Sequence, residues 1–166
     1  GIDTHQYGLC GRIPPYIFEP ISNVTDLSGV FANIMNLSPW DWGNTITGVK
    51  GKQYPKELFS MLKNLQNVSG IFQDEQILEN IEIPNELFKN NRLLTNISSM
   101  WQKCSWEDVV NNQIPSSLFD NNHNLYDTSY LFQSWGDSND ASGRSPKIID
   151  KNLFTYTKLL RHIILS

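Results

Sequence analysis

Four of the five tryptophans are the residues whose type and position most favour a binding role. They are Trp40, Trp42, Trp106 and Trp135. An indole offers a large apolar surface and one N–H donor, and tryptophan is enriched at the centres of protein interfaces. Two interpretations remain open. Each indole caps the apolar end of its own segment, or the four form an exposed row that binds a partner protein or a surface glycan. We treat them as a candidate binding site.

The residues that most often bind metals have no suitable spacing. The three histidines are His5, His123 and His162, and only His5 has a cysteine, Cys10, within a few residues. A zinc site there would need two further ligands. The second cysteine, Cys104, lies far from Cys10 along the chain, so we expect two free thiols. No metal site is predicted.

Catalytic motifs are also missing from the sequence. The acidic loop with Asp137, Asn139 and Asp140 does not have the spacing of a calcium loop and is read as a solvated loop. The nucleophile elbow, the phosphate-binding loop and the dinucleotide fingerprint are absent, and no spacing selects a pair of carboxylates for glycoside hydrolysis. We therefore expect no catalytic residues, no cofactor and no enzymatic activity.

Composition limits the classes of partner. The chain has 166 residues, of which 39% are hydrophobic and 18% charged, and its net charge is -4. A core can form, and no strongly basic footprint for nucleic acid is present. No apolar run is long enough for a membrane-spanning helix, so no membrane span is expected.

A recurring register of apolar residues is the main structural signal. Segments of the type Ile-Pro-x-x-Leu-Phe end at Phe18, Phe59, Phe88, Phe119 and Phe154, the last without the proline. The sixth, ninth and thirteenth residues after each phenylalanine tend to be leucine, then valine or isoleucine, then a second aromatic. The four complete copies of that second aromatic are Phe31, Phe72, Trp101 and Phe132. Such periodicity is typical of stacked structural repeats.

Insertions interrupt the register at two places. The extra residues fall in 38–51 and 136–145, and the four candidate tryptophans lie in or beside the same part of successive copies. Insertions in repeat proteins usually collect on one face. The same register places asparagine and serine around a buried residue, so the glycosylation motifs at Asn67 and Asn96 are read as by-products of the pattern, like the one at Asn23.

The spacing predicts an α/β fold, a leucine-rich-repeat-like solenoid with short strands and helical turns. The Leu-x-x-Val/Ile pieces have the β-branched residues of short strands. The Pro-x-Glu-Leu-Phe pieces have proline in the first position and an acid close behind it, as helix starts do. Residues 1–166 are expected to form one repeat domain of about four and a half repeats, a piece of a longer solenoid.

These residues resemble the leucine-rich-like repeats of BspA-type bacterial surface proteins, their mycoplasma relatives and some phage proteins. The closest matches are 67–72 and 96–101. The resemblance implies a non-enzymatic binding or scaffolding module, acting in adhesion or protein–protein interaction at a bacterial cell surface or in a virion. The alternatives are a structural subunit of a bacteriophage virion and, with least support, a carbohydrate-active enzyme. Both ends are expected to contact further repeats or neighbouring subunits.

Overall fold

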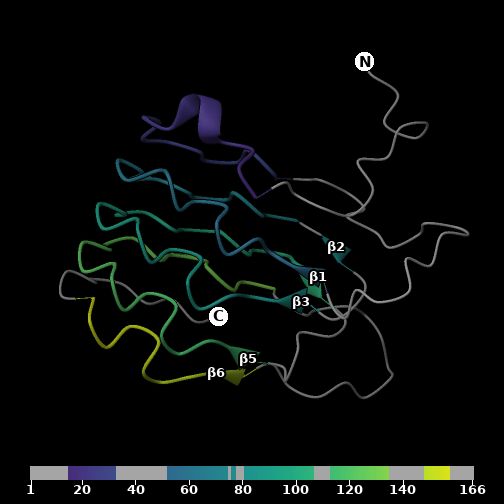
Figure 1. Cartoon of the computed structure of the whole chain (residues 1–166). Helices are drawn as coiled ribbons and strands as arrows, with labels where there is room; N and C mark the ends of the chain where they lie inside the picture. Colours follow the sequence, from purple (N-terminus) through teal and green to yellow (C-terminus); the bar gives the residue numbers. More distant parts are fainter. Residues whose placement is uncertain are drawn as a thin grey trace, which may run out of the picture.

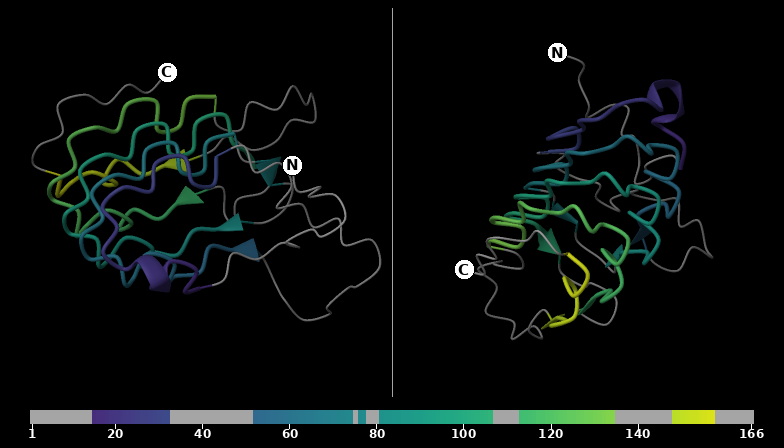
Figure 2. Two further views of the ribbon diagram at one scale, coloured as in Figure 1. Left: turned by 90° about the horizontal axis from the view of Figure 1, so that it is seen from above. Right: turned by 90° about the vertical axis from the view of Figure 1, so that its left-hand side faces the viewer.

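The computed structural model describes residues 15–32, 52–74, 76–77, 81–106, 113–134 and 148–157. These segments form a stack of coils, which we number in chain order. Coil 1 is 15–32, coil 2 is 52–74 with 76–77, coil 3 is 81–106, coil 4 is 113–134 and coil 5 is 148–157. Coil 1 lies at one end of the stack and coil 5 at the other (Figure 1). Coils 2 to 4 leave the strand-bearing side, turn at the far side and return, as the views in Figure 2 also show.

Each coil bends through successive tight turns rather than through helices. In coil 2, the amides of Leu58, Ser60 and Leu62 donate to the carbonyls three residues earlier. Coils 3 and 4 repeat these bonds at the equivalent positions. The pattern of burial explains why the chain forms turns rather than a helix, because every third residue from Phe59 to Ile71 is buried. A spacing of three keeps those side chains inside a chain of turns, whereas an α-helix would spread them around its surface.

Regular secondary structure is very short. The strands are β1 (Lys52–Gln53), β2 (Gln76–Ile77), β3 (Ile81–Glu82), β4 (Ser105–Trp106), β5 (Gln113–Ile114) and β6 (Ile148–Ile149). They form three parallel pairs, β1 with β3, β2 with β4 and β5 with β6. The other regular element of the described segments is the 3-10 helix η1 (Glu19–Ile21), which contains Pro20 and buries no residue.

The predicted α/β fold class is therefore wrong. The described residues contain no α-helix, and their strands have two residues each. The predicted helix starts at Pro-x-Glu-Leu-Phe are β-turns. In place of the predicted strands at Leu-x-x-Val/Ile, coils 1 to 4 each have a single residue that forms an isolated parallel β-bridge with its counterpart in the next coil. These bridged residues are Asp26, Asn67, Asn96 and Asp127. Proline and acid residues favour a β-turn as well as a helix start, and the spacing of three selects the turn.

Backbone hydrogen bonds hold adjacent coils in register. The amides of Leu27, Gly29 and Phe31 in coil 1 donate to the carbonyls of Asn67, Ser69 and Ile71 in coil 2. The same alternating pattern joins coil 2 to coil 3 and coil 3 to coil 4. Every second backbone amide therefore donates a hydrogen bond to the neighbouring coil. The intervening amides donate hydrogen bonds that close turns within their own coil. This division satisfies the buried backbone without regular helices or sheets.

Two columns of aromatic rings form the centre of the core. In the first column, Phe88 stacks on Phe59 with ring centroids 5.1 Å apart and on Phe119 at 5.7 Å, with interplanar angles of 9° and 21°. In the second column, Trp101 stacks between Phe72 and Phe132, at 6.4 and 5.7 Å. These separations are typical of favourable offset stacking. Each ring of a column thus stacks on its counterparts in the neighbouring coils.

Buried asparagines occupy one position of the coil, three residues after the phenylalanine. Asn91 Nδ2 donates to the carbonyl oxygens of Phe59 and Leu62 in the preceding coil, at 2.9 and 2.8 Å. Asn122 Nδ2 donates to those of Phe88 and Asn91, at 3.2 and 2.8 Å. Both side chains are fully buried. The two amides therefore bind adjacent coils together inside the core.

A left-handed backbone recurs in the turns that follow the bridged residues. Gly29, Gly70, Ser99 and Tyr130 hold equivalent positions with φ of 65°, 59°, 54° and 58°. Each is the third residue of a turn closed by a bond between residues three apart, such as Ile71 N to Val68 O. A turn with positive φ at this position favours glycine, and other residues adopt it at a cost of about 1–2 kcal/mol.

Exchanging residues at this position should change stability in opposite directions. We expect Gly70→Ala to lower the free energy of unfolding by about 1–2 kcal/mol, because its φ is positive and a Cβ there would lie 3.1 Å from Gln73 Oε1. Ser99→Gly should raise it by a few tenths to about 1 kcal/mol. Urea unfolding of both variants tests this, and a stabilised Gly70→Ala protein would contradict the turn geometry.

Candidate functional site

The candidate tryptophan row falls mostly outside the described residues. Trp40, Trp42 and Trp135 are not among them. The backbone of Trp106 is placed in β4, where it pairs with Ile77 of β2. The proposed row of exposed indoles therefore stays a prediction. The fifth tryptophan, Trp101, is fully buried in the second aromatic column.

Of the histidines and cysteines considered as metal ligands, the structure describes His123 and Cys104. His123 is exposed, and its Nδ1 lies 3.0 Å from the carbonyl oxygen of Tyr156. Cys104 is buried, and its Sγ lies 3.0 Å from the carbonyl oxygen of Phe72. No group of three or more metal-ligating residues occurs within the described segments. His5, His162, Cys10 and the 137–140 loop lie outside them.

The bridged residues form a polar ladder along one side of the stack. In coils 1 to 4, the Oδ1 of Asp26, Asn67, Asn96 or Asp127 accepts a hydrogen bond from the amide of the serine two residues later. Side-chain carbonyls commonly close turns in this way. The serine takes part through its backbone amide, and the Asp or Asn side chain supplies the acceptor. The glycosylation motifs at Asn67 and Asn96 thus coincide with a structural turn.

Asp26, the residue of the polar ladder in coil 1, should make the free energy of unfolding depend on pH. The bond from the Ser28 amide holds the pKa of Asp26 below its ordinary value of 3.8, and Asn67 Nδ2 donates to the same carboxylate at 2.9 Å. Because the folded pKa is the lower one, Asp26 stabilises the fold above pH 3.8, and this contribution is lost as the pH falls through the folded pKa.

Asp26→Asn should reveal this contribution. The variant keeps an oxygen for the Ser28 amide and removes the charge. We expect wild type to be slightly more stable than Asp26→Asn at pH 7, with a smaller difference at pH 2. Urea unfolding at both values measures it. A difference that is the same at pH 2 and pH 7 would show that the carboxylate charge has no role.

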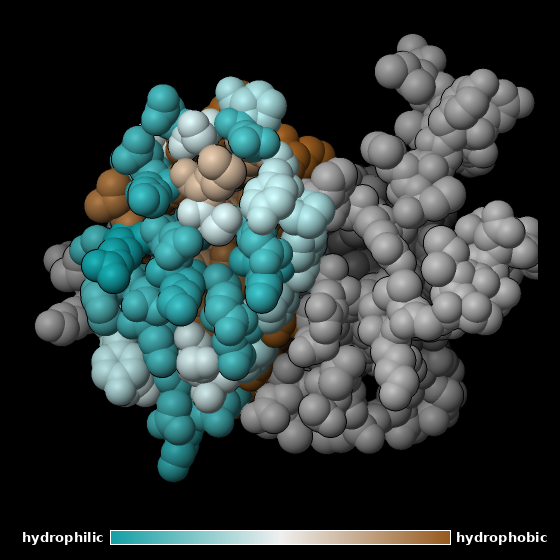
Figure 3. Space-filling model, in the orientation of Figure 1, coloured by the Kyte–Doolittle hydropathy of each residue, from teal (hydrophilic) through white to brown (hydrophobic). Residues whose placement is uncertain are grey.

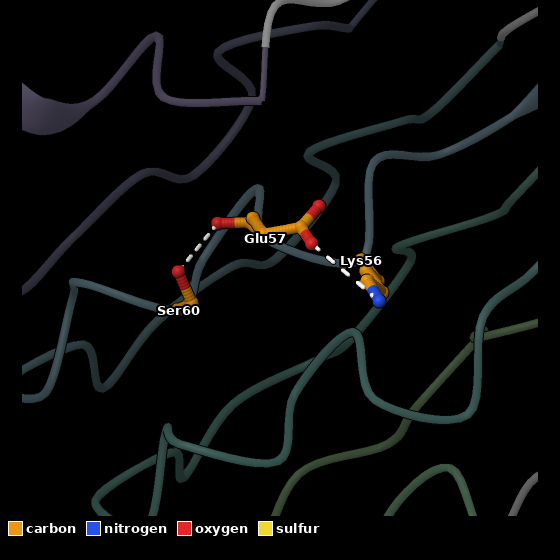
Figure 4. A network of polar contacts seen from close by, with 3 residues as sticks. All are labelled: Lys56, Glu57 and Ser60. Atoms are coloured by element: carbon orange, nitrogen blue, oxygen red, sulfur yellow. Dashed lines mark hydrogen bonds and ion pairs between the residues drawn. The ribbon is translucent and has the colours of Figure 1, made fainter.

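A column of exposed basic residues lies four residues after the first phenylalanine of coils 2 to 4. Its members are Lys63, Arg92 and His123, and we call it the basic column. The phenylalanines of these coils stack at 5.1 and 5.7 Å, so the column repeats at about the spacing of adjacent strands. Within the described segments, an ion pair joins Lys56 Nζ and Glu57 Oε1 at 3.8 Å (Figure 4). No ion pair joins a residue of the basic column to a carboxylate of these segments.

Side-chain bonds on both sides of the basic column fix the coils in register. Asn90 Nδ2 donates to Ser60 O at 3.2 Å between coils 2 and 3. Asn124 Nδ2 donates to the carbonyl of Arg92 at 2.9 Å between coils 3 and 4. His123 contacts Tyr156 of coil 5 through its ring nitrogen and through an edge-to-face ring contact at 6.5 Å. The backbone that carries the column is thus held at three successive interfaces.

The surface around these turns carries mostly polar side chains, with Met61 and Leu93 as exposed apolar residues. Figure 3 shows a mainly hydrophilic face over the described segments, with apolar atoms at its margins. Tyr156 is 53% exposed beside His123, and Asn64 and Asn124 are exposed next to the column. Sequence reasoning missed this surface, because it counted apolar residues only. Counting four residues forward from each phenylalanine would have found it.

Comparison with known proteins leaves the family undetermined. No protein-family model, no curated protein and no solved structure matches the chain. Among the described residues, no helix is long and apolar enough to cross a membrane.

Proposed function

We propose that this chain is a non-enzymatic binding or scaffolding module of a bacterial or phage surface protein, acting outside the cell in adhesion or protein–protein interaction. One observation carries the proposal. Polar residues of successive coils lie in register along the stack, as Asp26, Asn67, Asn96 and Asp127 do. A rigid scaffold that repeats side chains at fixed intervals gives an extended surface for a partner.

The buried polar groups support a structural rather than a catalytic interior. In the described part of the chain they are Asn91, Asn122, Thr128 and Thr157, two amides and two hydroxyls. The buried residues of the described segments that can ionise are Tyr54 and Cys104, and both belong to the apolar core cluster. The placement of the module at a surface rests on the resemblance of segments 67–72 and 96–101 to bacterial surface repeats.

Binding without turnover is the test of this function. The purified chain is titrated against an array of surface polysaccharides and extracellular-matrix proteins, and the mass of each bound ligand is measured before and after incubation. We expect saturable binding with unchanged ligand mass. A shortened glycan would show an enzyme. A chain that binds nothing and assembles into a large symmetric particle would favour a structural virion subunit.

A further inference from the structure

We propose that the basic column, Lys63, Arg92 and His123, with its flanking amides and Tyr156, is a binding surface for an anionic polysaccharide. This inference rests on the proposed binding function and names the ligand class and the residues that bind it. The candidate tryptophans have no part in it, so it can fail or succeed independently of them.

The alignment of the column is the first argument. Three basic side chains occupy the same position on consecutive coils, although the whole chain has a net charge of -4. Like charges directly opposite one another on adjacent strands are destabilising. The turns that hold the column, 60–64, 89–93 and 120–124, contain three cations, Lys63, Lys89 and Arg92, and one carboxylate, Asp120. A polymer with regularly spaced anions would neutralise this excess.

The order of the backbone beneath the column is the second argument. Asn90, Asn124 and His123 each bond a carbonyl of a neighbouring coil, so the three basic residues project from a fixed frame. A bond donated by His123 Nδ1 to Tyr156 O leaves the other ring nitrogen, Nε2, as the one available to a ligand. Binding therefore requires little ordering of the protein backbone, which lowers the entropic cost of holding an extended polymer.

The neighbouring side chains favour a sugar polymer over a simple polyphosphate. Asn64 and Asn124 are exposed one position after the column, and a primary amide both donates to and accepts from hydroxyl groups. Tyr156 offers an exposed ring that contacts His123 edge to face. Amides and an aromatic ring beside a row of basic side chains match a ligand that alternates hydroxyl-bearing rings with anionic groups.

The test compares four polymers and two charge-matched variants of the whole chain. The polymers are dextran sulfate, alginate, neutral dextran and a thymidine oligonucleotide. The column variant is Lys63→Gln with Arg92→Gln. The control is Lys103→Gln with Lys151→Gln, which removes the same charge from exposed lysines outside the column. Affinity is measured by calorimetry at low and at physiological salt, and circular dichroism checks that each variant keeps its melting temperature.

We expect wild type and the control to bind dextran sulfate or alginate, with weaker binding at higher salt. The column variant should lose about tenfold in affinity, since two partly screened ion pairs are removed. Dextran sulfate and alginate separate a sulfate-bearing from a carboxylate-bearing ligand. His123→Gln should add a further loss, because it removes the third basic side chain of the column.

Four results would overturn the proposal. Equal loss in both double variants would mean that net charge alone drives binding. Equal affinity for the oligonucleotide would remove the preference for sugar. Binding only to neutral dextran or to proteins would refute the anionic ligand while leaving the binding function intact, whereas binding to no polymer and no protein on the array would refute both.

Discussion

Phe88→Ala should lower the free energy of unfolding by about 3–5 kcal/mol, the range for removing a fully buried phenylalanine. The side chain of Phe88 is fully buried, and its ring stacks on Phe59 at 5.1 Å and on Phe119 at 5.7 Å. Alanine would remove both stacking contacts and leave a cavity in the middle of the first aromatic column. The melting temperature should fall by roughly 2–4 °C for each kcal/mol lost.

The control for Phe88 is an exposed aromatic in the same stack. Tyr16 is 55% exposed, so Tyr16→Ala should change stability by no more than about 0.5 kcal/mol. Phe88→Leu should fall between wild type and Phe88→Ala, because leucine refills part of the cavity. Equal stability of Phe88→Ala and Tyr16→Ala would show that the aromatic column is not the centre of the core.

Asn91→Asp should lower the free energy of unfolding at pH 7 by about 3–5 kcal/mol, the cost of leaving an uncompensated charge inside the core. The substitution changes almost no volume. It replaces Nδ2, which donates to Phe59 O and Leu62 O, with an oxygen that has no proton to donate once ionised. Three oxygens would then meet in a fully buried site. Burial disfavours the charged form, so the pKa of the new carboxyl is raised in the folded state.

The pH dependence separates this charge effect from simple loss of packing. Because the folded pKa exceeds the unfolded one, the folded state binds the proton more tightly, and the variant loses stability as the pH rises above the ordinary value of about 3.9. Below that value the protonated acid regains one donor. We therefore expect a smaller deficit at pH 4 than at pH 7, measured by urea unfolding at both values.

A neighbouring residue supplies the matched control. Asn90→Asp makes the same chemical change one position away, where the side chain is exposed and bonds Ser60 O at 3.2 Å. Its effect should stay within about 0.5 kcal/mol at either pH. If both variants lost the same stability, the buried amide of Asn91 would have no special part in joining the coils.

The apolar register was readable from the sequence because hydrophobic burial leaves its period in the residue types. The first phenylalanine, the leucine six residues later and the aromatic thirteen residues later are buried in coil 2 as Phe59, Leu65 and Phe72. The same reasoning missed the position three residues after the phenylalanine. That position is apolar at Leu62 but polar at Asn91 and Asn122, and a polar residue does not reveal its burial when its bonding partners are backbone carbonyls of another coil.

The sequence by itself determined which residues recur and which of them supply the apolar core, since these follow from residue type and spacing. Only the tertiary structure decided how the chain bends between them. Proline followed by an acid suits a helix start and a β-turn equally well, and the bonds between coils, such as Leu27 N to Asn67 O, select the turn. The basic column likewise cannot be recognised from the sequence of any single coil. Lys63, Arg92 and His123 become neighbours only when successive coils stack in register.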